Sequence, residues 1–180
     1  MPDDPKPRLT RCALLVKDIK RMEAFYRKVL GFAVTDRGSF RDMEELVFLS
    51  NDPGEHHQFV LVTGRPDKVG MNLVGQLSFF VEDLDELRAI HGRVLEEDNN
   101  LLNRCSTHGN AWSIYFNDPE ENVIEVYTHT SWYIPQPHAV PFDLTQSNEE
   151  IMRVTEEHCR QDPGFKSAQE RRAQMSDLMS

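Results

Sequence analysis

The chain has 180 residues, of which 39% are hydrophobic and 28% charged, and its nine glycines and ten prolines exclude collagen-like and wholly disordered chains. The formal net charge of −10 repels phosphate backbones, and no apolar run approaches the roughly 20 residues of a membrane span, so we expect neither a nucleic-acid nor a membrane partner. The three scattered cysteines form no disulfide framework and the first residues lack the apolar core of a signal peptide, so we expect a cytoplasmic protein.

The first half of the chain predicts a strand, a helix and three more strands. An apolar, partly alternating run predicts a strand at 9–16. Asp18 is a typical N-cap, the apolar residues after it follow helical spacing, and Gly31 is a typical helix end. The three further strands are expected at 32–35, 45–49 and 57–63.

The same order of elements returns 65 residues later, where Val81-Glu82-Asp83-Leu84 matches Val16-Lys17-Asp18-Ile19. Asp83 caps the second helix, and the strands of this copy are expected at 76–81, 101–105, 111–116 and 122–128. A repeat of this kind indicates two copies of one supersecondary unit, each of the form βαβββ.

The expected fold is therefore α+β, with two βαβββ modules (8–64 and 74–128) forming one cup-shaped mixed-sheet domain over 8–130. A proline-rich linker is expected at 131–146. A helical C-terminal extension follows at 147–180, opened by a capping box at Ser147.

The segment from Val16 to Gly31 resembles the first strand-to-helix passage of the vicinal oxygen chelate superfamily, and 115–125 resembles its final hairpin. That superfamily includes glyoxalase I, methylmalonyl-CoA epimerase, bleomycin-resistance proteins and type I extradiol ring-cleavage dioxygenases. The resemblance covers about residues 8–128 and implies a pocket for a small molecule and a homodimer.

Three details resemble the extradiol dioxygenases. His57 lies in a segment similar to the strand that carries an active-site histidine, and His108 precedes a glycine as the substrate-contacting histidine does. Tyr115 precedes Glu125 by ten residues, the spacing between the active-site tyrosine and the iron-binding carboxylate of those enzymes. The resemblance implies catalytic roles for His57, His108 and Tyr115, a metal ligand in Glu125, and Fe(II) or another divalent metal as cofactor.

Two of the metal ligands that the resemblance implies are missing. Those dioxygenases hold Fe(II) with two histidines and a carboxylate, and the histidine positions match Arg11 and Gln76 here. A guanidinium has no lone pair for a metal, so we expect Arg11 and Gln76 to contact substrate or Glu125 instead. His57, His108 and Glu125 offer a different set of metal-binding groups, and the sequence leaves open whether any metal binds.

Alternatives stay open at two positions. Glu125 either binds a metal, forms an ion pair with Arg11 or accepts a hydrogen bond from Gln76. A buried carboxylate is costly unless it is paired. His56 and His57 point to opposite sides of a strand, so only one can enter the cup. The family match favours His57, whereas unbroken alternation from the matching position in the second copy favours His56, which we place among the substrate-binding residues.

The resemblance favours extradiol cleavage of a catechol-type aromatic through chelation of two vicinal oxygens. One alternative is a metal-free protein that binds or sequesters a small molecule, in which Arg11 meets an anionic group. Another is a metal-independent isomerase or lyase that uses Glu125 and His57 as acid and base.

Overall fold

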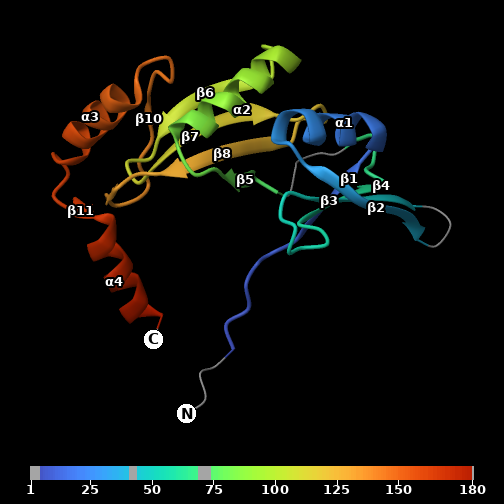
Figure 1. Ribbon diagram of the computed structural model, residues 1–180, viewed down its shortest axis with the longest axis horizontal. Coiled ribbons are helices and arrows are strands. Elements are labelled where there is room, and N and C mark those ends of the chain that lie inside the picture. Colours follow the sequence, from blue (N-terminus) through green and yellow to red (C-terminus); the bar gives the residue numbers. More distant parts are fainter. Residues whose placement is uncertain (1–4, 41–43, 69–73, 180) are drawn as a thin grey trace. The chain divides into compact units, whose positions relative to one another are not determined.

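The computed structural model describes residues 5–40, 44–68 and 74–179, and the chain divides into two compact units, 1–72 and 73–180 (Figure 1). Each unit holds one of the predicted βαβββ modules, so the α+β class and the duplication are confirmed. Within these described ranges, no helix combines the length and apolar character that a membrane crossing requires.

The first module forms a four-stranded sheet with one helix. Its elements are β1 (Cys12–Val16), α1 (Ile19–Leu30), β2 (Ala33–Phe40), β3 (Glu44–Ser50) and β4 (Phe59–Thr63). The strand order is β1-β4-β3-β2, with β1 parallel to β4 and the other pairs antiparallel.

Helix α1 begins and ends where the sequence predicts. The Asp18 side chain accepts a hydrogen bond from the Arg21 backbone N–H at 3.0 Å, and Gly31 adopts the left-handed conformation with φ of 74°. The buried face carries Tyr26, whose ring centroid lies 4.8 Å from that of Phe59 on β4. This apolar contact fixes the helix on the sheet.

Several strand boundaries differ from the prediction, and β1 begins at Cys12 instead of residue 9. β2 continues beyond residue 35 because it stays paired with β3 as far as Phe40. β4 begins at Phe59, so His57 precedes the strand instead of lying in it. The Gln58 side chain accepts the Asn51 backbone N–H at 2.9 Å and so closes the turn that contains both histidines.

The second module repeats this arrangement. It contains β5 (Leu77–Phe80), α2 (Leu84–Glu97), β6 (Leu102–Thr107), β7 (Ala111–Asn117) and β8 (Val123–His129). The order β5-β8-β7-β6, with β5 parallel to β8, is that of the first module, and α2 runs along the sheet (Figure 1).

The strands β7 and β8 have one apolar face and one polar face. Ile114 and Phe116 alternate with Tyr115, and successive side chains of a strand point to opposite faces. Both apolar residues are fully buried, as is Leu87 on α2, which contacts these strands. Tyr115 and its cross-strand partner Glu125 therefore lie on the face opposite to α2.

The C-terminal extension folds against the second module. Its elements are β9 (Trp132–Tyr133), β10 (Val140–Pro141), α3 (Asn148–Cys159), β11 (Lys166–Ser167) and α4 (Ala168–Leu178). The segment expected as an extended linker pairs with the module, because β10 adds an edge strand beside β6. β11 pairs with β9, which ties the start of α4 back to the chain after β8.

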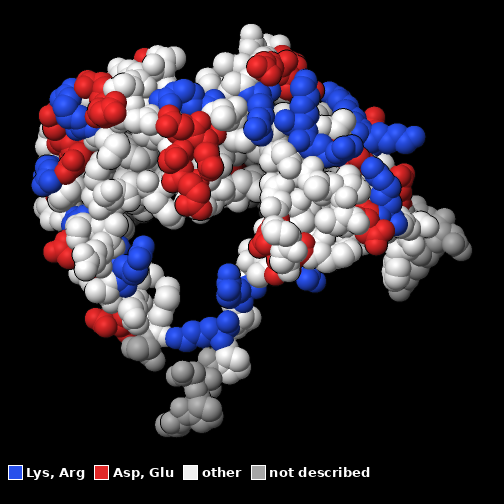
Figure 2. All heavy atoms as spheres, in the orientation of Figure 1, with Lys and Arg blue, Asp and Glu red and all other residues white. Residues whose placement is uncertain are grey.

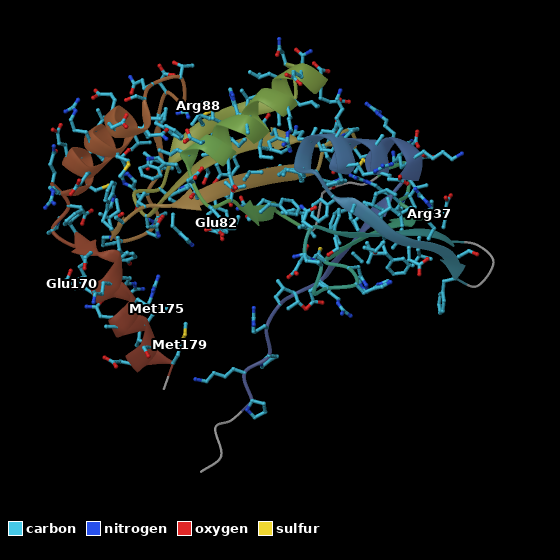
Figure 3. All side chains as sticks on the ribbon, in the orientation of Figure 1. Arg37, Glu82, Arg88, Glu170, Met175 and Met179 are labelled. Carbon is cyan, nitrogen blue, oxygen red and sulfur yellow. The ribbon has the colours of Figure 1, made fainter. Side chains whose placement is uncertain are left out.

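Arg88 of α2 anchors this extension. Its guanidinium donates to the Leu144 and Gln146 carbonyls, both at 3.1 Å, and to Asn148 Oδ1 at 2.9 Å (Figure 3). It also bonds Asp85 at 2.7 Å, within the group of acidic side chains at the start of α2 that Figure 2 shows in red. The anchor joins the chain before α3 to the module.

The buried carboxylate of Glu23 on α1 predicts an acid-sensitive contribution to stability. Arg37 bonds both carboxylate oxygens, one of them at 2.7 Å, and Arg27 adds a third bond at 3.3 Å (Figure 3). The hydrogen bond from Arg37 is the main cause of the lowered pKa of Glu23, so its contribution exists above the unfolded pKa, about 4.3, and disappears as pH falls through the folded pKa.

We expect Glu23→Gln to lower the free energy of unfolding at pH 7 by about 1–2 kcal/mol. Urea unfolding of wild type and variant at pH 7 and pH 3.5 measures it, and the difference should shrink at the lower pH. A difference independent of pH would show that the loss comes from packing and not from the ion pair.

Candidate functional site

The second module contains a pocket of about 500 Å³ on the polar face of its sheet. Glu125 is the one carboxylate among its lining residues, and three of the residues expected to form the site, Gln76, His108 and Tyr115, line it as well. The remaining lining residues are Ser78, Asn110, Ala111, Tyr127, His129 and Gln136.

Glu125 is held by three hydrogen-bond donors. Tyr115 donates its hydroxyl to Oε1 at 2.5 Å, while Ser78 Oγ at 2.6 Å and Gln76 Nε2 at 2.8 Å donate to Oε2. Glu125 is 8% exposed, so these bonds replace the water that burial removes. Of the partners that the sequence left open for Glu125, Gln76 is one that bonds it.

The environment separates the pKa values of the two bonded groups. Burial raises the pKa of Glu125, but other effects, of which the hydrogen bonds from Ser78 and Tyr115 are the largest, together lower it by more than burial raises it. The pKa of Glu125 is therefore below its usual value. Burial, followed by the bond to Glu125, raises the pKa of Tyr115 to about 12. At neutral pH the pair is thus a carboxylate and an intact phenol.

His108 continues the hydrogen-bonded chain. Its Nε2 lies 2.7 Å from the Tyr115 hydroxyl, and its Nδ1 lies 2.7 Å from the backbone carbonyl of His138. A carbonyl oxygen only accepts, so Nδ1 carries a proton and Nε2 faces Tyr115. The chain runs without a break from the His138 carbonyl through His108 and Tyr115 to Glu125.

The C-terminal extension fixes the loop that carries His108. Gln136 Nε2 donates to the His108 carbonyl at 2.7 Å, and Thr130 Oγ1 donates to the Gly109 carbonyl at 2.9 Å. Gly109 has φ of 75°, and a Cβ there would come within 2.4 Å of the Ile134 side chain. A residue larger than glycine would therefore displace either the loop or the segment packed on it.

The site lies on a single cross-strand row. Arg104 on β6 is paired with Tyr115 on β7, Tyr115 with Glu125 on β8, and Glu125 with Ser78 on β5. Such neighbours stand side by side on one face of a sheet. The row is therefore a direct consequence of strand register.

The equivalent row of the first module has no such chemistry. There Asp36, Phe48, Val60 and Ala13 are paired in the same way across four strands. At the positions of Tyr115 and Glu125, this row has the apolar side chains Phe48 and Val60. The duplicated fold thus carries its polar centre in one copy.

The remaining predicted site residues belong to the first module. Arg11 lies before β1 and forms an exposed ion pair with Glu55 at 3.3 Å. His56 and His57 approach each other with their Nδ1 atoms 2.9 Å apart, and both rings contact Phe48. Burial lowers the pKa of His57, with Arg11 as the next cause. Their roles at a site remain predictions.

The donor set of the second module does not fit the metal that the resemblance implies. Both oxygens of Glu125 already accept hydrogen bonds from protein side chains. Gln76 lies where a histidine was expected, with its amide nitrogen toward the carboxylate. Over residues 5–40, 44–68 and 74–179, no three His, Cys, Asp or Glu side chains form a group suited to an ion. The acids and bases of the pocket are therefore its own side chains.

Sequence reasoning missed Ser78, Arg104 and Gln136. Ser78 could have been found, because it shares the strand face of Gln76 two residues away. Arg104 depends on the pairing of β6 with β7, where the register shifts between Leu102 and Arg104. Gln136 depends on the fold of the extension, for which the sequence offers no periodic signal.

Comparisons with known proteins agree with this fold. The sequence model of the Glyoxalase/Bleomycin resistance protein/Dioxygenase superfamily matches residues 8–126. A search among curated proteins finds no match.

Several solved structures are similar in fold. A glyoxylase/bleomycin resistance protein/dioxygenase domain from Frankia sp. EAN1pec has a TM-score of 0.61 at 18% identity, covering 70% of this chain and 100% of that one. A mutant of the fosfomycin resistance protein FosX from Listeria monocytogenes, complexed with Mn(II), has 0.53 at 15%, covering 70% and 95%. The glyoxalase I of Leishmania major has 0.53 at 22%, covering 68% and 87%.

The bond between Tyr115 and Glu125 makes a testable contribution to the acidity of the carboxyl group. Tyr115→Phe removes a donor to the carboxylate, so we expect the pKa of Glu125 to rise. A carbon-13 NMR titration of labelled glutamate side chains measures this. Tyr127→Phe is the control, since that hydroxyl lines the pocket and is not among the groups that shift Glu125. An unchanged titration in Tyr115→Phe would contradict the assigned bond.

Proposed function

The chain belongs to the Glyoxalase/Bleomycin resistance protein/Dioxygenase superfamily, and within it we propose a metal-independent enzyme that moves a proton on a small oxygenated molecule. The unbroken chain His138 carbonyl, His108, Tyr115 and Glu125 in the second module's pocket is the observation that carries the proposal. The reaction class is acid–base isomerisation or lysis next to a carbonyl group.

The hydrogen-bonded chain has two possible proton arrangements. It contains three hydrogen bonds and therefore three protons. With Glu125 ionised, Tyr115 donates to Glu125 and His108 Nε2 donates to Tyr115, which makes His108 an imidazolium. With Glu125 protonated, the two bonds at the Tyr115 hydroxyl reverse, the bond to the His138 carbonyl stays as it is, and His108 is neutral. The two arrangements carry the same net charge.

Enolisation of a bound carbonyl compound converts one arrangement into the other. The C–H proton next to the carbonyl passes to Glu125, and the electron pair of that bond forms the C=C bond of the enol. The carbonyl oxygen takes the Tyr115 proton, and Tyr115 recovers one from His108. The step needs no net proton from solvent, and its reverse returns a proton to the same carbon. While the enol is bound, the carboxyl proton of Glu125 can exchange with water, so deuterium from D2O enters the substrate on return. If the deprotonated carbon carries a hydroxyl group, the enol is an enediol, and the proton can return to the former carbonyl carbon as that hydroxyl group gives up its own.

The lining residues match this task in size and polarity. A volume of about 500 Å³ holds a small organic molecule. Tyr127 and His129 provide aromatic walls, and Phe80 packs edge-on against Tyr127 at 5.7 Å. Ser78 and Gln76 hold Glu125 in place, so the base is oriented before the substrate arrives.

Exchange of carbon-bound protons with deuterium tests the proposal. In D2O with EDTA present, we expect the protein to exchange the protons next to the carbonyl of at least one member of a panel of hydroxy ketones and 2-oxo acids, followed by proton NMR. Glu125→Gln should slow this by about 100-fold or more, because the base is lost. Glu82→Gln is the control, an exposed carboxylate outside the pocket (Figure 3).

Equal exchange rates in wild type and Glu125→Gln would contradict the proposal. If no compound of the panel exchanges although ligands bind, the alternative of a metal-free binding protein gains support.

Extradiol cleavage of a catechol is the second candidate function. The hydrogen bond between His108 and Tyr115, beside Glu125, favours it, because the resemblance to the dioxygenases implies these three residues in one site. It ranks second because the donor set around Glu125 does not fit a metal.

Ring cleavage has a direct test. Protein loaded anaerobically with Fe(II) or Mn(II) is mixed with a panel of catechols and exposed to air. We expect no absorbance from a yellow ring-cleavage product above that of metal and catechol without protein. A product that appears only with metal-loaded protein and is lost in Glu125→Gln would establish the dioxygenase and overturn our ranking.

A further inference from the structure

Arg104 lies over the ring of the tyrosine of the site. The carbon of its guanidinium is 4.0 Å from the centroid of the Tyr115 ring, a cation–π contact that the pairing of β6 with β7 creates. Arg104 is exposed and is not itself a lining residue of the pocket, whereas Tyr115 is. The cation therefore stands at the edge of the pocket, over one wall of it.

The hydrogen-bond donors of this guanidinium are unused. In the part of the chain that the structure describes, the Arg104 side chain forms neither a hydrogen bond nor an ion pair, and its ring contact is its one interaction. Arg37, Arg88 and Arg153, by contrast, each bond a carboxylate. Because the ring contact occupies none of its hydrogen-bond donors, this guanidinium can meet a planar anion with its fork of N–H groups.

Charge around the pocket favours an anion at Arg104. The chain from His108 to Glu125 is neutral overall in both proton arrangements, so Arg104 adds an uncompensated positive charge next to it. Tyr115 stands between Arg104 and Glu125 along the cross-strand row. An anionic group held by Arg104 is thus separated by a ring from the one carboxylate of the pocket.

We infer that Arg104 is an anion-binding residue of this pocket and that the substrate carries a carboxylate group. The carboxylate accepts two N–H bonds from the guanidinium, while the rest of the molecule reaches past Tyr115 toward Glu125. The aromatic walls accommodate an apolar or aromatic body behind the carboxylate. The identity of the substrate rests on the proposed function, but binding of the anion does not.

Benzoate and benzamide are matched probes for the inference, because they share shape and ring and differ in charge. Their dissociation constants for the full-length protein are measured by ligand-observed NMR or calorimetry at low salt. We expect benzoate to bind more tightly than benzamide. Arg104→Gln should weaken benzoate binding by about tenfold or more and leave benzamide unchanged.

Arg171→Gln is the matched control variant. Arg171 also stacks on a tyrosine, with its guanidinium carbon 4.4 Å from the Tyr133 ring centroid, but Tyr133 does not line the pocket. We expect it to bind both probes as wild type does. Arg104→Lys keeps the charge without the fork of donors and should weaken benzoate binding less than Arg104→Gln does.

The outcomes separate this inference from the proposed function. Equal binding of benzoate by wild type and Arg104→Gln, or equal weakening by Arg171→Gln, would overturn the role of Arg104 whatever the exchange experiment shows. Loss of benzoate binding in Arg104→Gln together with retained binding in Glu125→Gln supports the anion site, even if Glu125 proves to have no part in proton transfer.

Discussion

The carboxylate of Glu125 is the charge around which the second module is organised. A charged group this deeply buried is unfavourable unless donors replace the lost water, and Tyr115, Ser78 and Gln76 do so at 2.5–2.8 Å. Tyr115 and Ser78 come from β7 and β5, the two strands on either side of β8, and Gln76 comes just before β5. Satisfying the carboxylate therefore also fixes the polar face on which the pocket lies.

The two copies of the βαβββ module differ in whether they contain a buried charge. Both modules have the same strand order and one helix packed on one face of the sheet. The first copy places Phe48 and Val60 where the second places Tyr115 and Glu125. Phe48 and Val60 carry no charge that burial would have to compensate, so the acid–base chemistry is confined to the second copy.

The C-terminal extension belongs to the site as much as to the scaffold. The carbonyl of His138 keeps a proton on Nδ1 of His108, and Gln136 holds the backbone of the same loop. Arg88 in turn fixes the chain that follows β10. The protonation pattern of the pocket thus depends on residues outside the duplicated unit.

The sequence by itself determined the modules, because period and capping are local properties: Asp18 and Gly31 mark α1, and the ten-residue spacing of Tyr115 and Glu125 spans one hairpin. Only the tertiary structure decided what joins them. Whether Arg104 faces Tyr115 depends on the irregular register of β6, and a shift of one residue would turn it to the other face. Such pairings form between segments far apart in the chain, where no local pattern records them.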